Sequence, residues 1–237
     1  MTEHINDTKT DPTSEQHTTM RKGSMENFTS IIWDWNGTLL DDVNICIESI
    51  NFSLEKRNLP LLTKEKYQEI FTFPVVDYYK KAGFDFSKNS FEELSHEFIG
   101  HYLDKLMGAN LHQDVEAILQ QFDNNGYRQF ILSAMEQTTL TDSVRHFNIE
   151  KYFNRIQGTG DIYAYGKLHN ANILMEASGL DPATTCLIGD TLHDLEVARQ
   201  LTCNCLLISS GHQSHARLAK KHHRVAHSIK EVLAFCK

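Results

Sequence analysis

The sequence of 237 residues has few of the features of a membrane or secreted protein. No stretch approaches the ~20 apolar residues that cross a bilayer, and the N-terminal end lacks the apolar core of a secretion signal. The five cysteines are odd in number and scattered, without the spacing of a disulfide framework or a metal site. We therefore expect a cytoplasmic protein with reduced thiols and no membrane partner.

The chain also has fewer positively than negatively charged residues. The chain has 23 Lys and Arg against 31 Asp and Glu, a formal net charge of −8. A chain with this balance has no general attraction for the phosphates of nucleic acids or for anionic lipid surfaces. We expect no nucleic-acid partner.

Residues 1–25 contain almost nothing to bury, being mostly Thr, Asp, Glu, Gln, His and Asn. Burial in such a segment cannot offset the entropy lost on ordering. We predict a disordered N-terminal tail over residues 1–25. The whole chain is 41% hydrophobic, which is enough for a substantial core in the remainder.

Helical signals follow one another between residues 43 and 107. Apolar residues recur at helical spacing from Val43, Thr63 suits an N-cap, Pro74 and Gly83 bound a short helix, and Ser90 opens a capping box. No convincing strand lies between these helices. The pattern predicts a helical cap domain over residues 41–110, inserted after the first strand.

The remaining chain alternates between strands and helices. Apolar, strand-like runs occur at residues 30–33, 128–133, 154–157, 184–190, 204–208 and 224–226. Parallel strands need crossover connections, so this alternation predicts an α/β fold with a doubly wound parallel sheet, built from residues 26–40 and 111–237. Asp34, Ser133 and Asp190 fall at the carboxyl ends of such strands, where the chemistry of open α/β sheets collects.

The segment from Asp34 to Asp41 resembles the first motif of the haloacid dehalogenase (HAD) superfamily, Asp-x-Asp-Gly-Thr followed by Leu-x-Asp. Three later segments agree with that family in order and spacing: Ser133 at a strand end, Lys167 at a helix start, and Gly189-Asp190-Thr191-Leu192-His193-Asp194. The helical insert is similar to the cap of the phosphoglycolate phosphatase and β-phosphoglucomutase branch. The resemblance implies a Mg²⁺-dependent phosphatase that acts on a small phosphorylated metabolite as a monomer or homodimer.

Candidate site residues follow from the motifs and from the chemistry of phosphoryl transfer. A carboxylate can attack phosphorus, Mg²⁺ prefers hard oxygen ligands, and the transferred group needs positive charge and aligned donors. We expect Asp34 to be the nucleophile, Ser133 and Lys167 to hold the phosphoryl group, and Asn36 to lie at the catalytic centre. The candidate metal ligands are Asp34, the backbone carbonyl of Asn36, Asp190 and Asp194; Trp35, Thr38 and Ala134 are further candidates for phosphate binding.

Simpler alternatives remain for several of these residues. Asp194 also suits a solvated acid at a helix N-terminus, Ser133 a local turn bond, and Lys167 an exposed charge at a helix start. The histidines show no ligand spacing; the segment from Gly211 to His215, which contains His212, is polar and is expected to be solvated. The segment 73–81 is either the specificity element of the cap or helix packing.

Asn36 departs from the family pattern, because it stands where the phosphatases carry a second Asp. In the family that Asp protonates the leaving alcohol and then activates water, and general acid–base help is worth about 10²–10⁴-fold. Either His169, Asp41 or water relays the proton in a slow phosphatase, or the substrate is an acyl phosphate or phosphonate, or the protein binds phosphorylated ligands without turnover. We predict from the sequence that Asn36→Asp raises turnover of simple phosphomonoesters.

Overall fold

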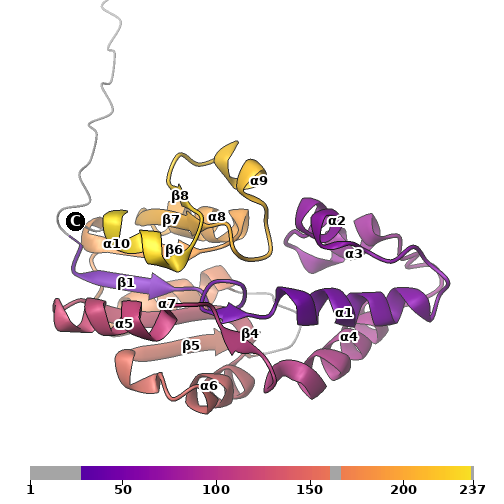
Figure 1. The fold of residues 1–237 in the computed structure, drawn as a ribbon, viewed down its shortest axis with the longest axis horizontal. Helices are drawn as coiled ribbons and strands as arrows, with labels where there is room; N and C mark the ends of the chain where they lie inside the picture. Colours follow the sequence, from indigo (N-terminus) through magenta and orange to yellow (C-terminus); the bar gives the residue numbers. More distant parts are fainter. Residues whose placement is uncertain (1–27, 161–166, 236–237) are drawn as a thin grey trace, which may run out of the picture.

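The computed structural model describes residues 28–160 and 167–235, and its centre is a six-stranded parallel sheet with the order β5-β4-β1-β6-β7-β8 (Figure 1). The strands are β1 (Ser30–Trp33), β4 (Arg128–Glu136), β5 (Arg155–Thr159), β6 (Thr185–Gly189), β7 (Asn204–Ile208) and β8 (Val225–Ala226). β1 lies between β4 and β6, with Trp33 paired to Ile131 on one side and Ile188 on the other. The expected α/β fold with a doubly wound parallel sheet is confirmed.

Helices cover both faces of the sheet, because successive side chains of a strand point to opposite faces. Ile31 and Trp33 of β1 belong to the apolar cluster that includes α5 (Val115–Asn124), α6 (Gln137–His146) and α10 (Val232–Phe235). Ile32 belongs to the cluster that includes α7 (Lys167–Ser178), α8 (Leu192–Gln200) and α9 (His215–Ala219). Every residue of β1 is buried, so its end is held firmly between its neighbours.

The helices between β1 and β4 are α1 (Val43–Glu55), α2 (Lys64–Ile70), α3 (Val75–Ala82) and α4 (Phe91–Leu106). In Figure 1 they project from the carboxyl end of the sheet. Thr63 accepts a hydrogen bond from the Lys66 amide and Ser90 one from the Glu93 amide, as expected of N-caps. Gly83 ends α3 in the left-handed region with φ 107°, which glycine adopts without strain.

A two-stranded antiparallel ribbon that the sequence analysis missed joins these helices to the sheet. β2 (Leu40–Asp41) pairs with β3 (Asn110–Leu111). Two-residue strands carry too few residues for an alternation pattern to be recognised. The ribbon brings the two ends of the helical segment together next to the end of β1.

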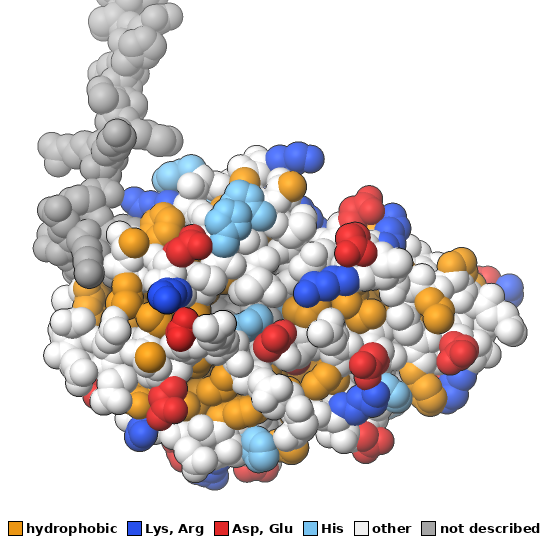
Figure 2. Space-filling view, in the orientation of Figure 1, with side chains coloured by type: hydrophobic (Ala, Val, Ile, Leu, Met, Phe, Trp, Pro, Cys, Tyr) orange, Lys and Arg blue, Asp and Glu red, His pale blue; other side chains and the backbone are white. Residues whose placement is uncertain are grey.

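One sequence prediction, the disordered tail over residues 1–25, concerns a segment outside the described residues. Within residues 28–160 and 167–235, no helix combines the length and apolar character needed to cross a membrane. On the face shown in Figure 2, acidic and basic side chains of the described residues are interspersed.

Candidate active site

Asp34 is delivered to the site by the end of β1. The residue is 7% exposed, and its backbone N–H donates to the carbonyl of Ile188 on β6, which continues the ladder of the sheet. Asp190 directly follows β6 and is fully buried. The two carboxylates therefore meet at adjacent strand ends, as expected from the parallel topology.

Ser133 lies within β4 rather than at its end, because the strand continues to Glu136. The pairing of β4 with β5 is irregular between Leu132 and Glu136, so the strand deviates where it reaches the site. The Ser133 hydroxyl accepts from the Met135 amide at 3.0 Å and donates to Asn36 Oδ1 at 3.3 Å. It therefore makes both the local turn bond and a contact within the site.

Lys167 begins α7 and is 4% exposed. Its Nζ lies 2.5 Å from Asp34 Oδ1 and 2.6 Å from Asp194 Oδ1. Burial alone would lower the pKa of this lysine, but the two carboxylates outweigh it and raise the pKa above its ordinary value. Lys167 is therefore a buried cation, not an exposed charge at a helix start.

Asp194 is fully buried in the first turn of α8 and completes a capping box with Thr191. Its Oδ2 accepts from the Thr191 amide at 3.0 Å and from the Thr191 hydroxyl at 2.6 Å, while its Oδ1 accepts from Lys167. Burial would raise the pKa of Asp194, yet Lys167 and Thr191 together lower it. The interpretation of Asp194 as a solvated helix charge is wrong, because the helix packs it against Lys167.

Oxygen atoms of Asp34, Asp190 and Asp194 all lie within 4.8 Å of one another, with Lys167 as the neighbouring cation. Burial is the main cause that raises the pKa of Asp34 well above its ordinary value and that of Asp190 to about 6. When all three carboxylates are ionised, their charge exceeds that of the one lysine. Hard oxygen donors with this excess fit a divalent cation.

Glycine 37 allows the chain to pass close to this cluster. It has φ 71°, and a Cβ atom there would collide with the carboxylate of Asp190. Its neighbour Thr38 is fully buried, with Oγ1 3.5 Å from Asp34 Oδ2 and 3.4 Å from Asp190 Oδ1. The Thr38 hydroxyl thus lies between the two carboxylates.

The other candidates for phosphate binding differ in what they offer. The ring of Trp35 is buried and packs against Phe147 with centroids 6.1 Å apart, so the side chain of Trp35 belongs to the core and only its backbone can serve a ligand. Ala134 lines the same cavity as Asp34. His169 and Asp41, the two suggested proton relays, are both exposed, and neither is among the described residues that line the cavity.

Asn36 is held by a hydrogen-bond network that the sequence analysis did not anticipate. Its Nδ2 donates to Asp42 Oδ2 at 2.7 Å and to the Tyr102 hydroxyl at 2.9 Å. Tyr102 comes from α4 and donates to the same Asp42 oxygen at 2.7 Å. Because Asp42 is fully buried and the Gly37 amide donates to its Oδ1, the carboxylate fixes the amide group of Asn36 in one orientation.

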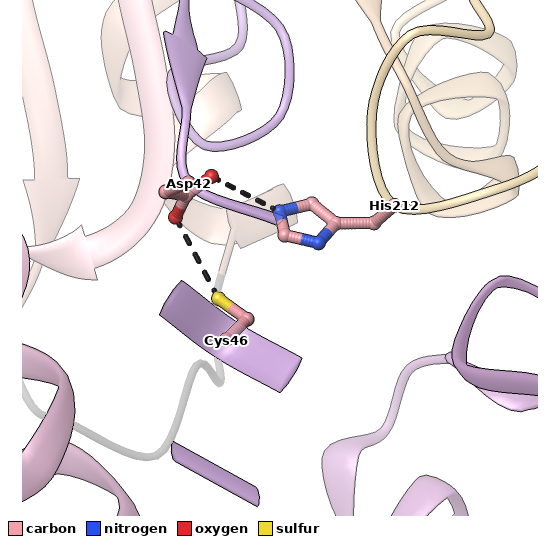
Figure 3. A group of neighbouring side chains, drawn as sticks. All are labelled: Asp42, Cys46 and His212. Carbon is pink, nitrogen blue, oxygen red and sulfur yellow. Dashed lines mark hydrogen bonds and ion pairs between the residues drawn. The ribbon is translucent and has the colours of Figure 1, made fainter. Parts of the chain in front are cut away.

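His212 contacts the other carboxylate oxygen of Asp42, and Figure 3 shows one Asp42 oxygen joined to His212 and the second joined to Cys46. The Nε2 of His212 is 3.4 Å from Asp42 Oδ1, its Nδ1 is 2.8 Å from the Tyr67 hydroxyl, and its backbone N–H donates to Asp190 Oδ2 at 2.5 Å. Burial would lower the pKa of His212, but Asp42 and then Asp190 raise it to about 9. The expectation that His212 is solvated is wrong: the loop after β7 folds over the site.

Asp42, Cys46 and His212 are close enough to resemble a metal site. However, the imidazole is positively charged at neutral pH, and burial, assisted by Asp42, raises the pKa of the Cys46 thiol. A protonated imidazole has no free lone pair and a neutral thiol is a poor metal ligand, and both groups contact the Asp42 carboxylate. The cluster is therefore a hydrogen-bonded support for Asn36. His212 comes just after β7, which is parallel to β1 and β6. This place in the chain was the signal in the sequence that could have assigned His212 to the site.

A cavity of about 180 Å³ lies between these strand ends and the helices α2 to α4. Asp34, Asn36, Lys167 and Asp190 line one side of it. Phe73, Val75, Tyr78 and Tyr79, from the segment proposed as a specificity element, line the other, whereas Lys80 and Lys81 of that segment are exposed.

The comparisons with known proteins agree with this geometry. The family model described as haloacid dehalogenase-like hydrolase matches residues 31–208. A 5'-nucleotidase of Pseudomonas aeruginosa is 21% identical over 214 residues, which cover 87% of this chain and 93% of that protein.

Among solved structures, a haloacid dehalogenase-like family hydrolase from Streptococcus pneumoniae is similar with a TM-score of 0.75 and 22% identity, covering 89% of this chain and 99% of that one. A predicted phosphoglycolate phosphatase from Haemophilus somnus has a TM-score of 0.73 and 18% identity, with 89% and 98% covered. The motifs of Asp34, Ser133, Lys167 and Asp190 lie within the matched residues. The chain belongs to the haloacid dehalogenase-like hydrolases.

Proposed function

We propose that this protein is a Mg²⁺-dependent phosphatase that hydrolyses a small phosphorylated metabolite through an aspartyl-phosphate on Asp34. The observation that carries the proposal is the buried cluster in which Lys167 contacts both Asp34 and Asp194, with Asp190 alongside. A carboxylate nucleophile, a fixed cation and surplus oxygen ligands are the parts that phosphoryl transfer requires. The helices α1–α4 act as the proposed cap domain over residues 41–110.

In the proposed first step, a carboxylate oxygen of Asp34 forms a bond to phosphorus, the bond from phosphorus to the leaving oxygen breaks, and the leaving oxygen takes a proton from water. Lys167 and Ser133 hold the phosphoryl oxygens, with backbone N–H groups at Trp35, Asn36 and Ala134 as further donors. Water then attacks the aspartyl-phosphate and releases inorganic phosphate. Bound Mg²⁺, held by Asp34, Asp190 and the backbone carbonyl of Asn36, with Asp194 nearby, would neutralise charge on the phosphoryl group.

In this proposal, Asn36 determines the rate of hydrolysis. Its amide is fully engaged as a donor to Asp42 and Tyr102, and an amide cannot transfer a proton to a leaving alcohol. Turnover of unactivated phosphomonoesters should therefore be slow by about 10²–10⁴-fold compared with an enzyme that has a general acid there. Acyl phosphates and phosphonates are alternative substrates, because their leaving groups need little protonation.

The relatives support a small monoester as substrate. The names of the 5'-nucleotidase and of the predicted phosphoglycolate phosphatase both refer to hydrolysis of phosphate monoesters of small molecules. A second candidate function, binding of a phosphorylated ligand without turnover, is favoured by the absence of a carboxylate at position 36.

The test is phosphate release from a panel of monoesters, acyl phosphates and phosphonates, with Mg²⁺ and with a chelator. We expect Mg²⁺-dependent release that Asp34→Ala abolishes and that Asp123→Asn, at an exposed position of α5, leaves unchanged. Release that persists in Asp34→Ala would exclude the aspartyl-phosphate. Mg²⁺-dependent binding of a phosphonate without release from any member would favour the non-catalytic function.

A further inference from the structure

The side of the cavity that faces the strand ends is aromatic. Its lining includes Tyr67, Phe71, Phe73, Tyr78, Tyr79, Phe91, Phe98 and Tyr102, which come from α2, α3, α4 and the segments next to them. Ring contacts connect them, for example Tyr78 with Tyr79 at 5.5 Å and Phe98 with Tyr102 at 6.0 Å between centroids. Such a wall favours an apolar, flat ligand group over a hydrated one.

The charges on the lining also favour an uncharged ligand group. Among the described residues that line the cavity, the cations are Lys167 and His212, and each already pairs with carboxylates. Glu136 also lines it, but both of its oxygens accept backbone N–H groups at the start of α6. A second anionic group on the substrate would thus lose its hydration without gaining a free cation from these residues.

Tyr78 supplies an independent observation. Its side chain is 2% exposed, it lines the cavity, and its hydroxyl is buried without a hydrogen-bond partner in the described part of the chain. A buried polar group without a partner is costly, so such groups are usually satisfied by a ligand, a protein atom or water. A polar ligand atom that reached this hydroxyl would remove that cost.

We propose that the cap side of the cavity binds an uncharged aromatic ring that carries a hydrogen-bonding atom for Tyr78, and that this ring belongs to the leaving group of the substrate. The inference rests on the proposed function, because the phosphoryl group then lies at Asp34 and Lys167. An apolar cavity of about 150 Å³ accommodates one benzene ring, and the whole cavity here is about 180 Å³. The preferred substrates are small aromatic phosphate monoesters without a carboxylate or a second phosphate.

The first experiment measures binding, so that it does not depend on turnover. The Mg²⁺-loaded protein is titrated by calorimetry with ethylphosphonate, benzylphosphonate, cyclohexylmethylphosphonate and 4-carboxybenzylphosphonate. We expect benzylphosphonate to bind about tenfold more tightly than each of the other three, which is a modest difference of about 1.4 kcal/mol. Equal affinity for the benzyl and ethyl compounds, or for the benzyl and carboxybenzyl compounds, would overturn the proposal.

Variants then locate the ring. Phe98→Leu should reduce the preference for benzylphosphonate over ethylphosphonate, whereas Phe52→Leu should not. Phe52 is a matched control, because it is 38% exposed on α1 and is not part of the described lining. A preference that survives Phe98→Leu unchanged would contradict a ring at the aromatic wall.

Tyr78→Phe tests the hydrogen bond with the three ring-hydroxylated isomers of benzylphosphonate. The isomer that binds best should lose its advantage over benzylphosphonate in Tyr78→Phe, while benzylphosphonate itself binds as before. If no isomer exceeds benzylphosphonate in the wild type, Tyr78 does not recognise the ring.

Kinetics separate this inference from the proposed function. Benzyl and ethyl phosphate have leaving alcohols of similar kind, so a higher kcat/KM for benzyl phosphate reports recognition rather than chemical activation. Hydrolysis of both at equal kcat/KM would remove the aromatic subsite and leave the phosphatase function intact. Tight binding of benzylphosphonate with no hydrolysis of any ester would remove the function and leave the subsite.

Discussion

At the scale of single residues, the most informative pair is Asn36 and Asp42. The Asn36 Nδ2 and the Asp42 Oδ2 lie 2.7 Å apart, and the amide is the donor because the ionised carboxylate can only accept. Asp42 precedes α1 but makes no side-chain cap bond to it, since its oxygens are directed to Asn36, Gly37 and Tyr102. An aspartate at position 36 would place a half-buried carboxylate in contact with the buried one of Asp42, which is strongly unfavourable unless they share a proton.

This contact refines the prediction made from the sequence. Asn36→Asp alone should lower the free energy of unfolding and fail to raise turnover by the full acid–base factor. The swapped double variant Asn36→Asp/Asp42→Asn keeps one amide and one carboxylate in contact. We expect it to recover stability and to hydrolyse ethyl phosphate about 10²-fold faster than wild type, as measured by kcat in steady-state assays.

Asp42→Asn alone is the control for that experiment, since it removes the carboxylate without creating a general acid. Its kcat for ethyl phosphate should not exceed that of wild type. A double variant that is as stable as wild type and no faster would mean that position 36 does not carry the acid–base function.

At the scale of elements, contacts from α4 tie the helical segment to the sheet. Tyr102 on α4 donates to Asp42 and accepts from Asn36, far along the chain from its own helix. Removing a donor from a buried carboxylate costs about 1–3 kcal/mol. Tyr102→Phe should therefore lower the free energy of unfolding by that amount in urea titrations.

Tyr152→Phe is the matched control for Tyr102→Phe. The Tyr152 hydroxyl makes only long contacts of 3.4 Å and 3.5 Å to Gln120 and Glu116, so its loss should change stability by less than about 0.5 kcal/mol. Equal effects of the two substitutions would show that the Tyr102–Asp42 bond contributes little.

Glu97 links α4 to the end of α1, and its titration makes the free energy of unfolding depend on pH. Burial would raise the pKa of Glu97, but hydrogen bonds from Lys56 and Arg57 outweigh burial and lower it. A lowered pKa in the folded state means that the stabilisation is present above the ordinary glutamate pKa and is lost as the pH falls below it. Glu97→Gln should thus be less stable than wild type in urea at pH 7, with the difference shrinking below pH ~4.5.

The exposed Glu55 on α1 provides the comparison, because Glu55→Gln should leave a stability difference that does not vary in this way. A Glu97→Gln difference that stays constant from pH 7 to pH 3 would contradict the ion pair as its source.

Patterns of local sequence predicted much of the fold and part of the site. The strand ends at Asp34 and Asp190, and the caps at Thr63 and Ser90, depend on nearby residues, and the structure has them as expected. Ser133 was misplaced at a strand end, because the continuation of β4 to Glu136 depends on pairing with β5. The spacing of residues in the sequence does not show which strands pair.

The support of Asn36 could not be predicted for the same reason. Tyr102 lies 66 residues from Asn36 and Tyr67 lies 145 residues from His212, so only the tertiary fold brings them together. The polar loop around His212 is typical of a solvated segment, and its burial follows from the packing of α2 over it.

At the scale of the whole molecule, the proposed metal site predicts that metal binding and stability are coupled. Without a metal, burial and the neighbouring Asp194 raise the pKa of Asp190 to about 6, so its ionisation at neutral pH opposes folding. A cation that binds only the folded state stabilises it by about 2.7 kcal/mol at 100 times its dissociation constant. Mg²⁺ should therefore raise the melting temperature of the wild type well above that measured in chelator.

Asp190→Asn separates the two effects. The substitution removes one buried negative charge and one oxygen ligand, so the melting temperature in chelator should rise while the increase caused by Mg²⁺ is largely lost. Asp123→Asn, at an exposed position of α5, should show the wild-type response in calorimetry. If Asp190→Asn kept the full Mg²⁺ response, the ion would be bound elsewhere, and the assignment of Asp190 as a ligand would be wrong; if it melted lower than wild type in chelator, the buried charge would not be the dominant cost at this site.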